Sequence, residues 1–137
     1  MGLILDSNIL IAAERRGDAV QKVILSVRAT FGNRECAVSA ISIIEIAHGI
    51  YRAKTLAISD RRRLFVEDVC RDFKIIPVTL EIAQLAGKIE GEQAAKGIGI
   101  PFEDLVIGST ALYLGFDVLT QNIRHFQLIP GLNAVTL

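Results

Sequence analysis

Signals for membranes, secretion and zinc binding are missing from this sequence. No apolar run approaches the ~20 residues that a membrane-spanning helix requires. The N-terminus has no basic region and reaches a charged residue, Asp6, directly after three apolar residues, so it does not resemble a signal peptide. The two cysteines, Cys36 and Cys70, form no Cys-x-x-Cys pair and join no zinc-binding cluster. We therefore expect a cytoplasmic protein without a membrane partner, whose thiols are reduced and buried.

The chain also has no excess of positive or negative charge. Its 15 lysine and arginine residues balance 15 aspartate and glutamate residues, whereas proteins that bind nucleic acid over a broad surface are usually basic. Any nucleic-acid contact is therefore predicted to be short and to use local basic clusters; the alternative is that these clusters are solvated helix faces. The clusters are Arg15–Arg16, Arg61–Arg63 and Arg124.

Apolar segments of two kinds alternate along the chain. With 51% hydrophobic residues, the composition suits one domain that covers residues 1–137. Ser39 or Ser42 is expected to cap one helix, and Thr79 another. Continuous apolar runs predict strands at 2–5, 36–38, 75–78, 118–120 and 134–137, and helical spacing predicts helices at 20–31, 41–50, around 64–69, from 80 onward and at 103–114. This alternation predicts an α/β sandwich around a mostly parallel sheet.

Two aspartates lie where parallel α/β sheets usually bind ligands. Asp6 ends the first predicted strand, and ligands gather at the carboxyl ends of such strands. The alternative is that Asp6 or Ser7 caps a following helix. Asp104 falls in the first turn of the predicted helix 103–114, where the helix dipole alone favours a negative charge. Because Asp104 adjoins the apolar face, we expect it to point inward and Glu103 to face water.

Glu45 has apolar neighbours on nearly every face of its predicted helix. We expect it to be buried, and a buried carboxylate is costly unless it is paired or binds a metal ion. The alternative is a glutamate at the edge of the helix that reaches solvent or pairs with His48, one turn further on.

Together, Asp6, Glu45 and Asp104 predict an acidic pocket for a divalent metal ion. Hard cations prefer oxygen ligands, and Mg²⁺ typically binds one or two carboxylates together with water and substrate phosphate. Carboxylates that are packed together also need a cation to offset their repulsion. Because the sequence offers no Ser or Cys nucleophile system, the pocket is predicted to use Mg²⁺ or Mn²⁺ to activate water for phosphodiester hydrolysis.

Four segments of the sequence resemble, in the same order, the motifs of PIN-domain nucleases. They are LDSNIL (5–10), SAISIIEIAHG (39–49), PFEDLVIG with Ala111 (101–111), and LTQNIRHF continuing to IPGL (119–132). The first three contain Asp6, Glu45 and Asp104. The set spans nearly the whole chain, and the length is similar to that of VapC-type toxins of bacterial and archaeal toxin–antitoxin pairs.

This resemblance implies a PIN-like three-layer α/β/α sandwich around a sheet of four to five strands. It implies a metal-dependent endoribonuclease that cuts structured RNA, such as tRNA or ribosomal RNA. It also implies a homodimer and a VapB-type antitoxin, which inserts a peptide beside the active site and represses the shared operon. We expect the helices around residues 50–69, with Arg61–Arg63 at their edge, to help form the dimer or the antitoxin groove.

The closing segment departs from the pattern of these nucleases. The family often carries a fourth acid at the position of Asn122 or His125, and this chain has none there. Asn122 can offer a carbonyl oxygen to a metal-bound water, whereas histidine is a poor ligand for Mg²⁺ but acceptable for Mn²⁺. Because Thr120 ends a predicted strand, we expect Thr120, Asn122 and His125 at the pocket edge, on the same side as Asp6. The alternative for His125 is a solvated surface turn.

Three other functions remain open from the sequence. A haloacid-dehalogenase-type phosphatase also begins with an aspartate after its first strand, but it requires a second aspartate where this chain has Asn8. A receiver-like signalling domain would need adjacent acids near the N-terminus, and residues 2–5 supply none. A catalytically weak PIN domain that binds RNA or a partner without cutting would share every motif described above.

Overall fold

All strands of the central sheet are parallel. The structure, a computed structural model, describes residues 1–137 and contains β1 (Leu3–Leu5), β2 (Cys36–Ser39), β3 (Lys74–Ile76), β4 (Asp117–Leu119) and β5 (Ala134–Val135). Their order in the sheet is β3-β2-β1-β4-β5, and every neighbouring pair is parallel. The predicted sheet of four to five strands is therefore confirmed, and its pairing is parallel throughout.

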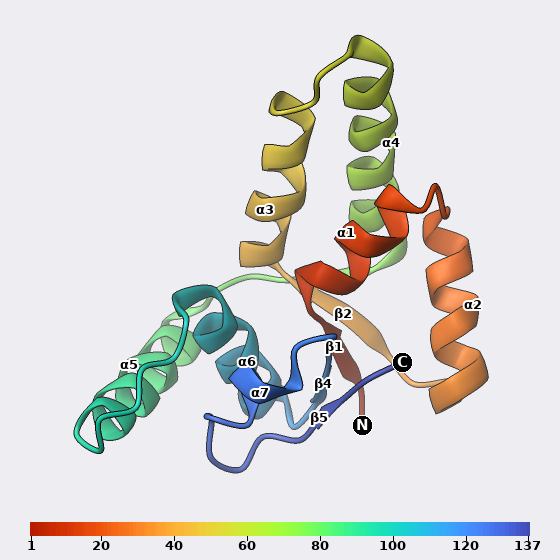
Figure 1. The fold of residues 1–137 in the computed structure, drawn as a ribbon. Coiled ribbons are helices and arrows are strands. Elements are labelled where there is room, and N and C mark those ends of the chain that lie inside the picture. The colour runs from red at the N-terminus through yellow and green to blue at the C-terminus, as the bar shows by residue number, and fades with distance from the viewer.

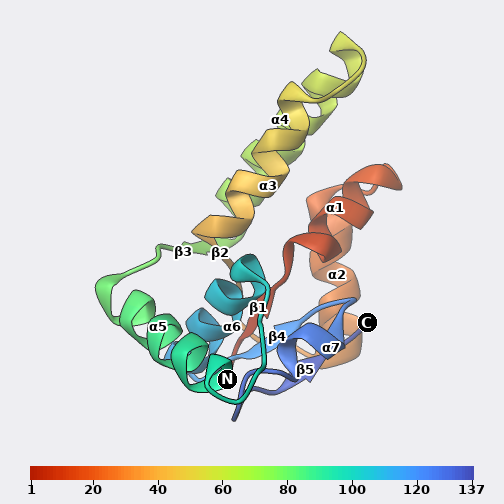
Figure 2. The same cartoon turned by 60° about the vertical axis from the view of Figure 1, so that its left-hand side comes forward.

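Helices cover both faces of this sheet (Figure 1 and Figure 2). α1 (Ser7–Arg15), α2 (Val20–Phe31) and α4 (Leu56–Asp72) contribute to one core, and α5 (Leu80–Ala94), α6 (Phe102–Leu114) and α7 (Ile123–Phe126) to the other. Leu3 and Leu5 of β1 join the first core and Ile4 joins the second, because alternate side chains of a strand point to opposite faces. This confirms the three-layer sandwich. None of the helices has the length and apolar character needed to cross a membrane.

Side-chain caps define where three of the helices begin. Ser39, Thr55 and Thr79 each accept a hydrogen bond from a backbone N–H of the first turn, at 3.3, 3.1 and 3.3 Å. Such a cap typically stabilises a helix by about 1 kcal/mol. Of the two predicted caps for α3 (Ala40–Tyr51), Ser39 is the one used, and Ser42 is buried within the helix.

α3 and α4 form a hairpin that projects away from the sheet (Figure 1). Apolar residues of both helices are buried between them. The Arg62 guanidinium donates to the Gly49 carbonyl at 2.7 Å, which ties the two helices together. Glu14 of α1 then binds Arg61 at 3.3 Å and Arg62 at 3.4 Å. The hairpin is thus anchored to α1 through Arg61 and Arg62, in the first half of α4.

Several predicted boundaries are wrong. The strand predicted at 75–78 ends at Ile76, because Pro77 has no N–H to donate to a ladder. α4 begins at Leu56, well before the predicted residues 64–69. The strand predicted at 134–137 contains only Ala134 and Val135. The four-residue helix α7 is too short to show an apolar period, so the sequence does not predict it.

The two cysteines differ in their surroundings. Both are free thiols, Cys36 half-buried and Cys70 exposed. The expectation that Cys70 is buried is wrong. The buried residues of α4 are Phe65 and Val69, and Cys70 lies outside the helix face that they form.

Gly108 lets α6 pack closely against the segment that follows α7. A Cβ at this position would overlap the Ile129 side chain and would lie 3.1 Å from Leu132 Cδ2. We expect Gly108→Ala to lower the free energy of unfolding by about 1–3 kcal/mol, because a packed core must shift to admit the methyl group. Gly87→Ala in α5 is the matched control, since nothing lies within 4 Å there and alanine favours a helix. Urea denaturation that gave both variants equal stability would contradict close packing at Gly108.

Candidate active site

Asp6 lies at the carboxyl end of β1, where the strand order reverses. The sheet continues from β1 to β2 on one side and to β4 on the other, and open α/β sheets bind ligands in the crevice at such a switch point. The Asp6 N–H donates to the Leu119 carbonyl at 2.9 Å, and the residue is 4% exposed. The structure therefore places Asp6 where the sequence predicts it.

Thr120, directly after β4, holds the Asp6 carboxylate. Thr120 Oγ1 donates to Asp6 Oδ2 at 2.8 Å and is itself fully buried. Asp6 occupies the N-cap position of α1, but its carboxylate makes no capping hydrogen bond. The alternative in which this side chain serves as a helix cap is therefore wrong. Burial raises the pKa of Asp6; the Thr120 hydrogen bond partly offsets that rise, and repulsion from Asp104 adds to it.

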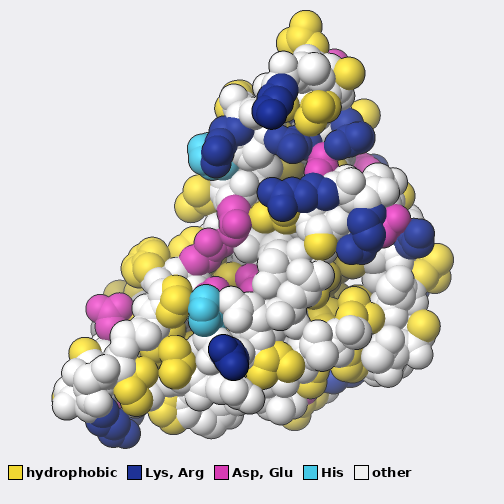
Figure 3. Space-filling model, viewed as in Figure 1, with side chains coloured by type: hydrophobic (Ala, Val, Ile, Leu, Met, Phe, Trp, Pro, Cys, Tyr) yellow, Lys and Arg dark blue, Asp and Glu magenta, His cyan; other side chains and the backbone are white.

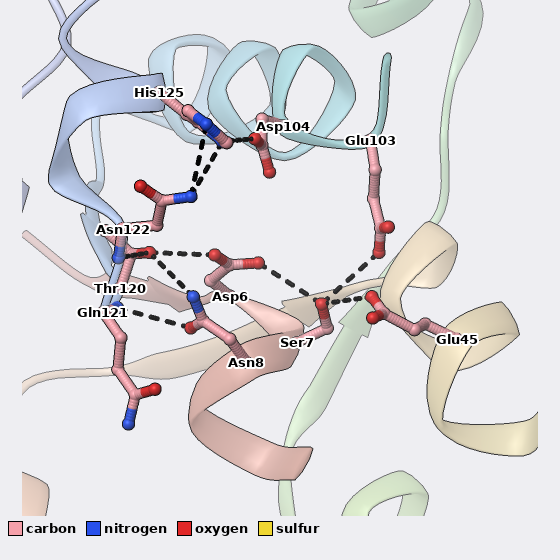
Figure 4. A network of polar contacts seen from close by, with 10 residues as sticks. All are labelled: Asp6, Ser7, Asn8, Glu45, Glu103, Asp104, Thr120, Gln121, Asn122 and His125. Carbon is pink, nitrogen blue, oxygen red and sulfur yellow. Dashed lines mark hydrogen bonds and ion pairs between the residues drawn. The ribbon is translucent and has the colours of Figure 1, made fainter. Parts of the chain in front are cut away.

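The Ser7 hydroxyl lies among three carboxylates (Figure 4). Ser7 Oγ donates to Glu45 Oε2 at 2.5 Å, while Asp6 Oδ1 and Glu103 Oε1 each lie 3.4 Å from it. A hydroxyl has a single proton to donate, so the short contact with Glu45 is the hydrogen bond. The two longer distances show how closely the acids of β1, α3 and α6 approach one another.

Glu45 is exposed, and the prediction that it is buried is wrong. Its apolar neighbours do not enclose it, because α3 lies in the projecting hairpin: Ile46 packs inward, whereas Ile44 is 70% exposed. The alternative in which Glu45 lies at the helix edge and reaches solvent is the one observed, whereas pairing with His48 is not, since the carboxylate bonds to Ser7. Glu45 thus reaches the pocket from an open helix face.

Glu103 belongs to the pocket, although the sequence predicts that it faces water. It lies in the first turn of α6, half-buried, and approaches Ser7. Burial, the hydrogen bond with Glu45 and repulsion from that carboxylate together raise the pKa of Glu103 to about 8. The Glu45–Glu103 pair therefore holds one proton at neutral pH. The available signal was the helix start set by Pro101, which puts both acids of Glu103-Asp104 in the first turn.

Asp104 points into the pocket, as predicted, and contacts His125. His125 Nδ1 lies 2.7 Å from Asp104 Oδ2 and 2.8 Å from Asn122 Nδ2. A hydrogen bond from Nδ1 to the Asp104 carboxylate requires the tautomer with its proton on Nδ1, and in that tautomer the Asn122 Nδ2, itself a donor, makes no hydrogen bond to this atom. His125 therefore lies at the pocket and not in a solvated turn.

Hydrogen bonds fix the segment between β4 and α7. Thr120 Oγ1 accepts from the Asn122 N–H at 2.8 Å, and Asn8 Oδ1 accepts from the Gln121 N–H at 3.3 Å. These bonds join the start of α1 to the loop that carries Asn122 (Figure 4). The structure thus brings the three residues expected at the pocket edge, Thr120, Asn122 and His125, next to the acids.

No lysine or arginine offsets the negative charge of this pocket. Asp104 is paired with His125 alone, and the other three acids form no ion pair. Figure 3 shows acidic side chains grouped in the middle of one face, with basic side chains above them. The donors are all oxygens, which suits a hard divalent cation, and Asp6 and Asp104 supply the two carboxylates that Mg²⁺ typically takes. No three Asp, Glu, His or Cys side chains are positioned to hold one ion together, so water and phosphate would complete its ligand shell.

Comparisons with known proteins agree with this geometry. The family model of the PIN domain matches residues 3–132. The chain belongs to the PIN-domain family. It is 31% identical to Ribonuclease VapC of Rickettsia bellii over 137 residues, which are 100% of this chain and 97% of that protein. It is also 31% identical to the tRNA(fMet)-specific endonuclease VapC of Salmonella typhimurium over 100 residues, 73% of each chain.

Solved structures of VapBC proteins share the fold of this PIN domain. VapBC2 from Rickettsia felis, bound to a DNA fragment from their promoter, has a TM-score of 0.83 at 24% identity and covers 100% of this chain and 99% of that chain. DNA-bound VapBC from Salmonella typhimurium has a TM-score of 0.81 at 25% identity, covering 99% and 98%. The phosphatase and receiver alternatives are therefore wrong, because family and fold are those of a PIN domain.

The raised pKa of Glu103 should make the metal-free PIN domain less stable as the pH rises. The ordinary pKa of a glutamate is 4.5 and that of Glu103 is about 8, so the folded state holds an extra proton between these values. The stability linked to that proton is present below pH 4.5 and is lost as the pH rises through 8. We expect Glu103→Gln in EDTA to be more stable than the parent at high pH, by about 1 kcal/mol after allowance for solvent screening.

Thermal unfolding across this pH range measures the effect. Glu92→Gln is the matched control, because this α5 side chain is 59% exposed and has only a 3.9 Å contact with Lys88. It should leave the pH dependence of unfolding unchanged. If Glu103→Gln followed the parent at every pH, no proton would be shared between Glu103 and Glu45.

Proposed function

We propose that this PIN domain is the ribonuclease toxin of a VapBC-type toxin–antitoxin pair, an endoribonuclease for structured RNA of the tRNA or ribosomal RNA class. The observation that carries the proposal is the gathering of Asp6, Glu45, Glu103 and Asp104 at the switch point of the sheet. Support also comes from two relatives, one named as a ribonuclease and one as a tRNA-specific endonuclease. Their similarity to this chain extends over 97% and 73% of their own length.

Asp6 and Asp104 are the candidate ligands for Mg²⁺ or Mn²⁺, and Glu45 shapes the site or helps hold a second ion. When bound, such an ion polarises a phosphate oxygen and lowers the pKa of its water. Thr120 fixes one oxygen of Asp6, and His125 fixes one oxygen of Asp104. These partners orient the carboxylates, as outer-shell partners of metal ligands do.

A VapB-type antitoxin is the partner that this family membership supports. A pocket of about 370 Å³ lies between α1, α3 and α4 and opens beside Glu45. Apolar and charged residues line it, among them Ile11, Arg15 and Phe65. An antitoxin peptide in this pocket would reach Glu45, and four residues of the expected partner region 50–69 contribute to its wall: Arg52, Arg62, Phe65 and Val66. A homodimer and a cytoplasmic location complete the proposal.

Replacement of either candidate ligand tests the proposal. Asp6→Asn and Asp104→Asn should each lower RNA cleavage by about 10³-fold or more, because several kcal/mol of transition-state stabilisation are lost with the ion. Binding of Mn²⁺ by calorimetry should weaken in parallel, while the circular dichroism spectrum stays that of the parent. Glu92→Gln on the exposed surface of α5 is the matched control. Full nuclease activity in either pocket variant, at matched purity, would refute the assignment, and an inactive parent that binds RNA would favour the catalytically weak alternative.

His125 should set the metal preference of the site. His125→Asp restores an acid at a position where the family often has one, so Mg²⁺ and Mn²⁺ should bind more tightly and the Mn²⁺ advantage of the parent should shrink. His125→Ala removes the contact with Asp104 and should weaken binding of both ions. His48→Ala replaces the chain's other histidine and serves as the control for metal affinity alone. Parental metal affinities and rates in both His125 variants would show that His125 does not act on the site.

A further inference from the structure

One face of α3 is exposed from the pocket to the hairpin tip. Ile44, Glu45, His48, Tyr51 and Arg52 are all exposed, Ile44 at 70% and Tyr51 at 78%. Their spacing of i, i+1, i+4, i+7 and i+8 places them on one side of the helix. We term these five residues the α3 stripe. It begins beside the acids with Glu45 and ends with Arg52 about 10 Å further along the axis, at 1.5 Å per residue.

The outer part of the hairpin is basic, although the chain as a whole is neutral. Residues 46–66 contain five lysine or arginine residues and a single carboxylate, Asp60. Two of the arginines bind Glu14 of α1. Figure 3 shows the result, with basic side chains gathered over the hairpin above the acidic group. Of these five cations, the three that make no ion pair are Arg52, Lys54 and Arg63.

Tyr51 provides an aromatic surface among these cations. The Arg63 guanidinium lies 5.9 Å from the centre of the Tyr51 ring, which is within the range of a cation–π contact. That contact orients the ring, while its 78% exposure leaves area for a second stacking partner. Aromatic side chains beside arginines are the usual means by which proteins stack the bases of single-stranded RNA.

The same charges make the hairpin tip a poor place for a second copy of the chain. A two-fold interface brings each patch against itself or its own neighbours, so the unpaired cations of one tip would face those of the other. A polyanion instead gains contacts with each of them and releases its counterions. The charge pattern therefore favours nucleic acid over self-association at this surface.

We propose that the α3 stripe, with Lys54 and Arg63, binds the single-stranded RNA next to the scissile bond. One base stacks on Tyr51, and the neighbouring phosphates bind Arg52 and Lys54. The inference rests on the proposed function, because it assigns the RNA-binding surface of that same site. It also explains how a chain without net charge holds a polyanion near four carboxylates: the attraction is confined to the hairpin, about two helical turns from the pocket.

Binding of a short, fluorescein-labelled, single-stranded RNA of mixed sequence tests the role of Tyr51. Fluorescence anisotropy in EDTA measures affinity without cleavage. Tyr51→Ala should weaken binding by about 5- to 150-fold, the effect expected for the loss of one stacked base, and Tyr51→Phe should retain the parental affinity. Tyr113→Ala is the matched control, because Tyr113 is the chain's other tyrosine and lies 52% exposed on α6.

The salt dependence of binding tests the cations. Arg52→Gln should weaken binding and lower the slope of log affinity against log salt by about 0.7, the value for one phosphate contact on a single strand. Lys88→Gln on α5, where the side chain is 72% exposed, should change neither quantity.

Equal RNA affinity in Tyr51→Ala and Tyr113→Ala would overturn the inference, as would a parent chain that binds no RNA. Unchanged RNA affinity in Tyr51→Ala together with lost self-association, or lost binding of a co-expressed antitoxin, would assign the stripe to that partner instead.

Cleavage with Mg²⁺ is measured in a separate assay. RNA binding that depends on Tyr51 without any cleavage would refute the proposed nuclease and leave the stripe assigned to RNA. Cleavage with parental binding in Tyr51→Ala would refute the stripe alone.

Discussion

Repulsion among carboxylates is the constraint around which the crevice at the end of β1 is built. No lysine or arginine pairs with these acids. Instead, the hydroxyls of Thr120 and Ser7 donate to Asp6 and Glu45, and His125 contacts Asp104. A hydroxyl donor stabilises a carboxylate and fixes its direction while leaving its charge in place. The one acid without a hydroxyl or histidine partner at short range, Glu103, instead has a pKa of about 8 and is protonated near neutral pH. The pocket therefore retains the negative charge that a divalent cation needs, although repulsion between the remaining carboxylates destabilises the metal-free fold.

The parallel sheet explains why acids so far apart in sequence meet here. β1 and β4 are neighbours, so Asp6 and Thr120 emerge side by side at the same edge, and α6 and α3 bring their acids toward the crevice (Figure 4). The hairpin is the least supported of these elements, because α3 and α4 project from the sheet. It is held to α1 by Glu14, which bonds to Arg61 and Arg62, and its two helices are joined by the bond from Arg62 to Gly49. Gly49 lies one helical turn from Glu45, so these contacts help determine the position of Glu45.

The sequence predicts those parts of the site that depend on local pattern. Asp6 could be placed because a short apolar run ends at it, and Asp104 because it adjoins the apolar side of its helix. Glu45 was expected to be buried, and the error has a tertiary cause: apolar neighbours enclose a side chain only if another element covers that face, and nothing covers this face of α3. Glu103 was expected in water because helical spacing sets it apart from Asp104, but both acids in a first turn lie near the end of the helix, where a pocket can receive either. The path of the hairpin, and hence the partner of Glu45, follows from packing that no local pattern encodes.

The neutral composition of the chain hides a separation of charge that has consequences for how a polyanion would approach. Acids occupy the crevice and unpaired cations occupy the hairpin tip, about 10 Å along α3 from Glu45 by helical rise. At physiological ionic strength charges are screened beyond about 8 Å, so the two groups act nearly independently in solvent. The cations of the hairpin can then bind a phosphate backbone, because the acids do not cancel their attraction at this distance. The acids in turn repel a phosphate unless a cation is present. Binding and reaction would consequently be separable steps, the first sensitive to monovalent salt and the second to the divalent ion.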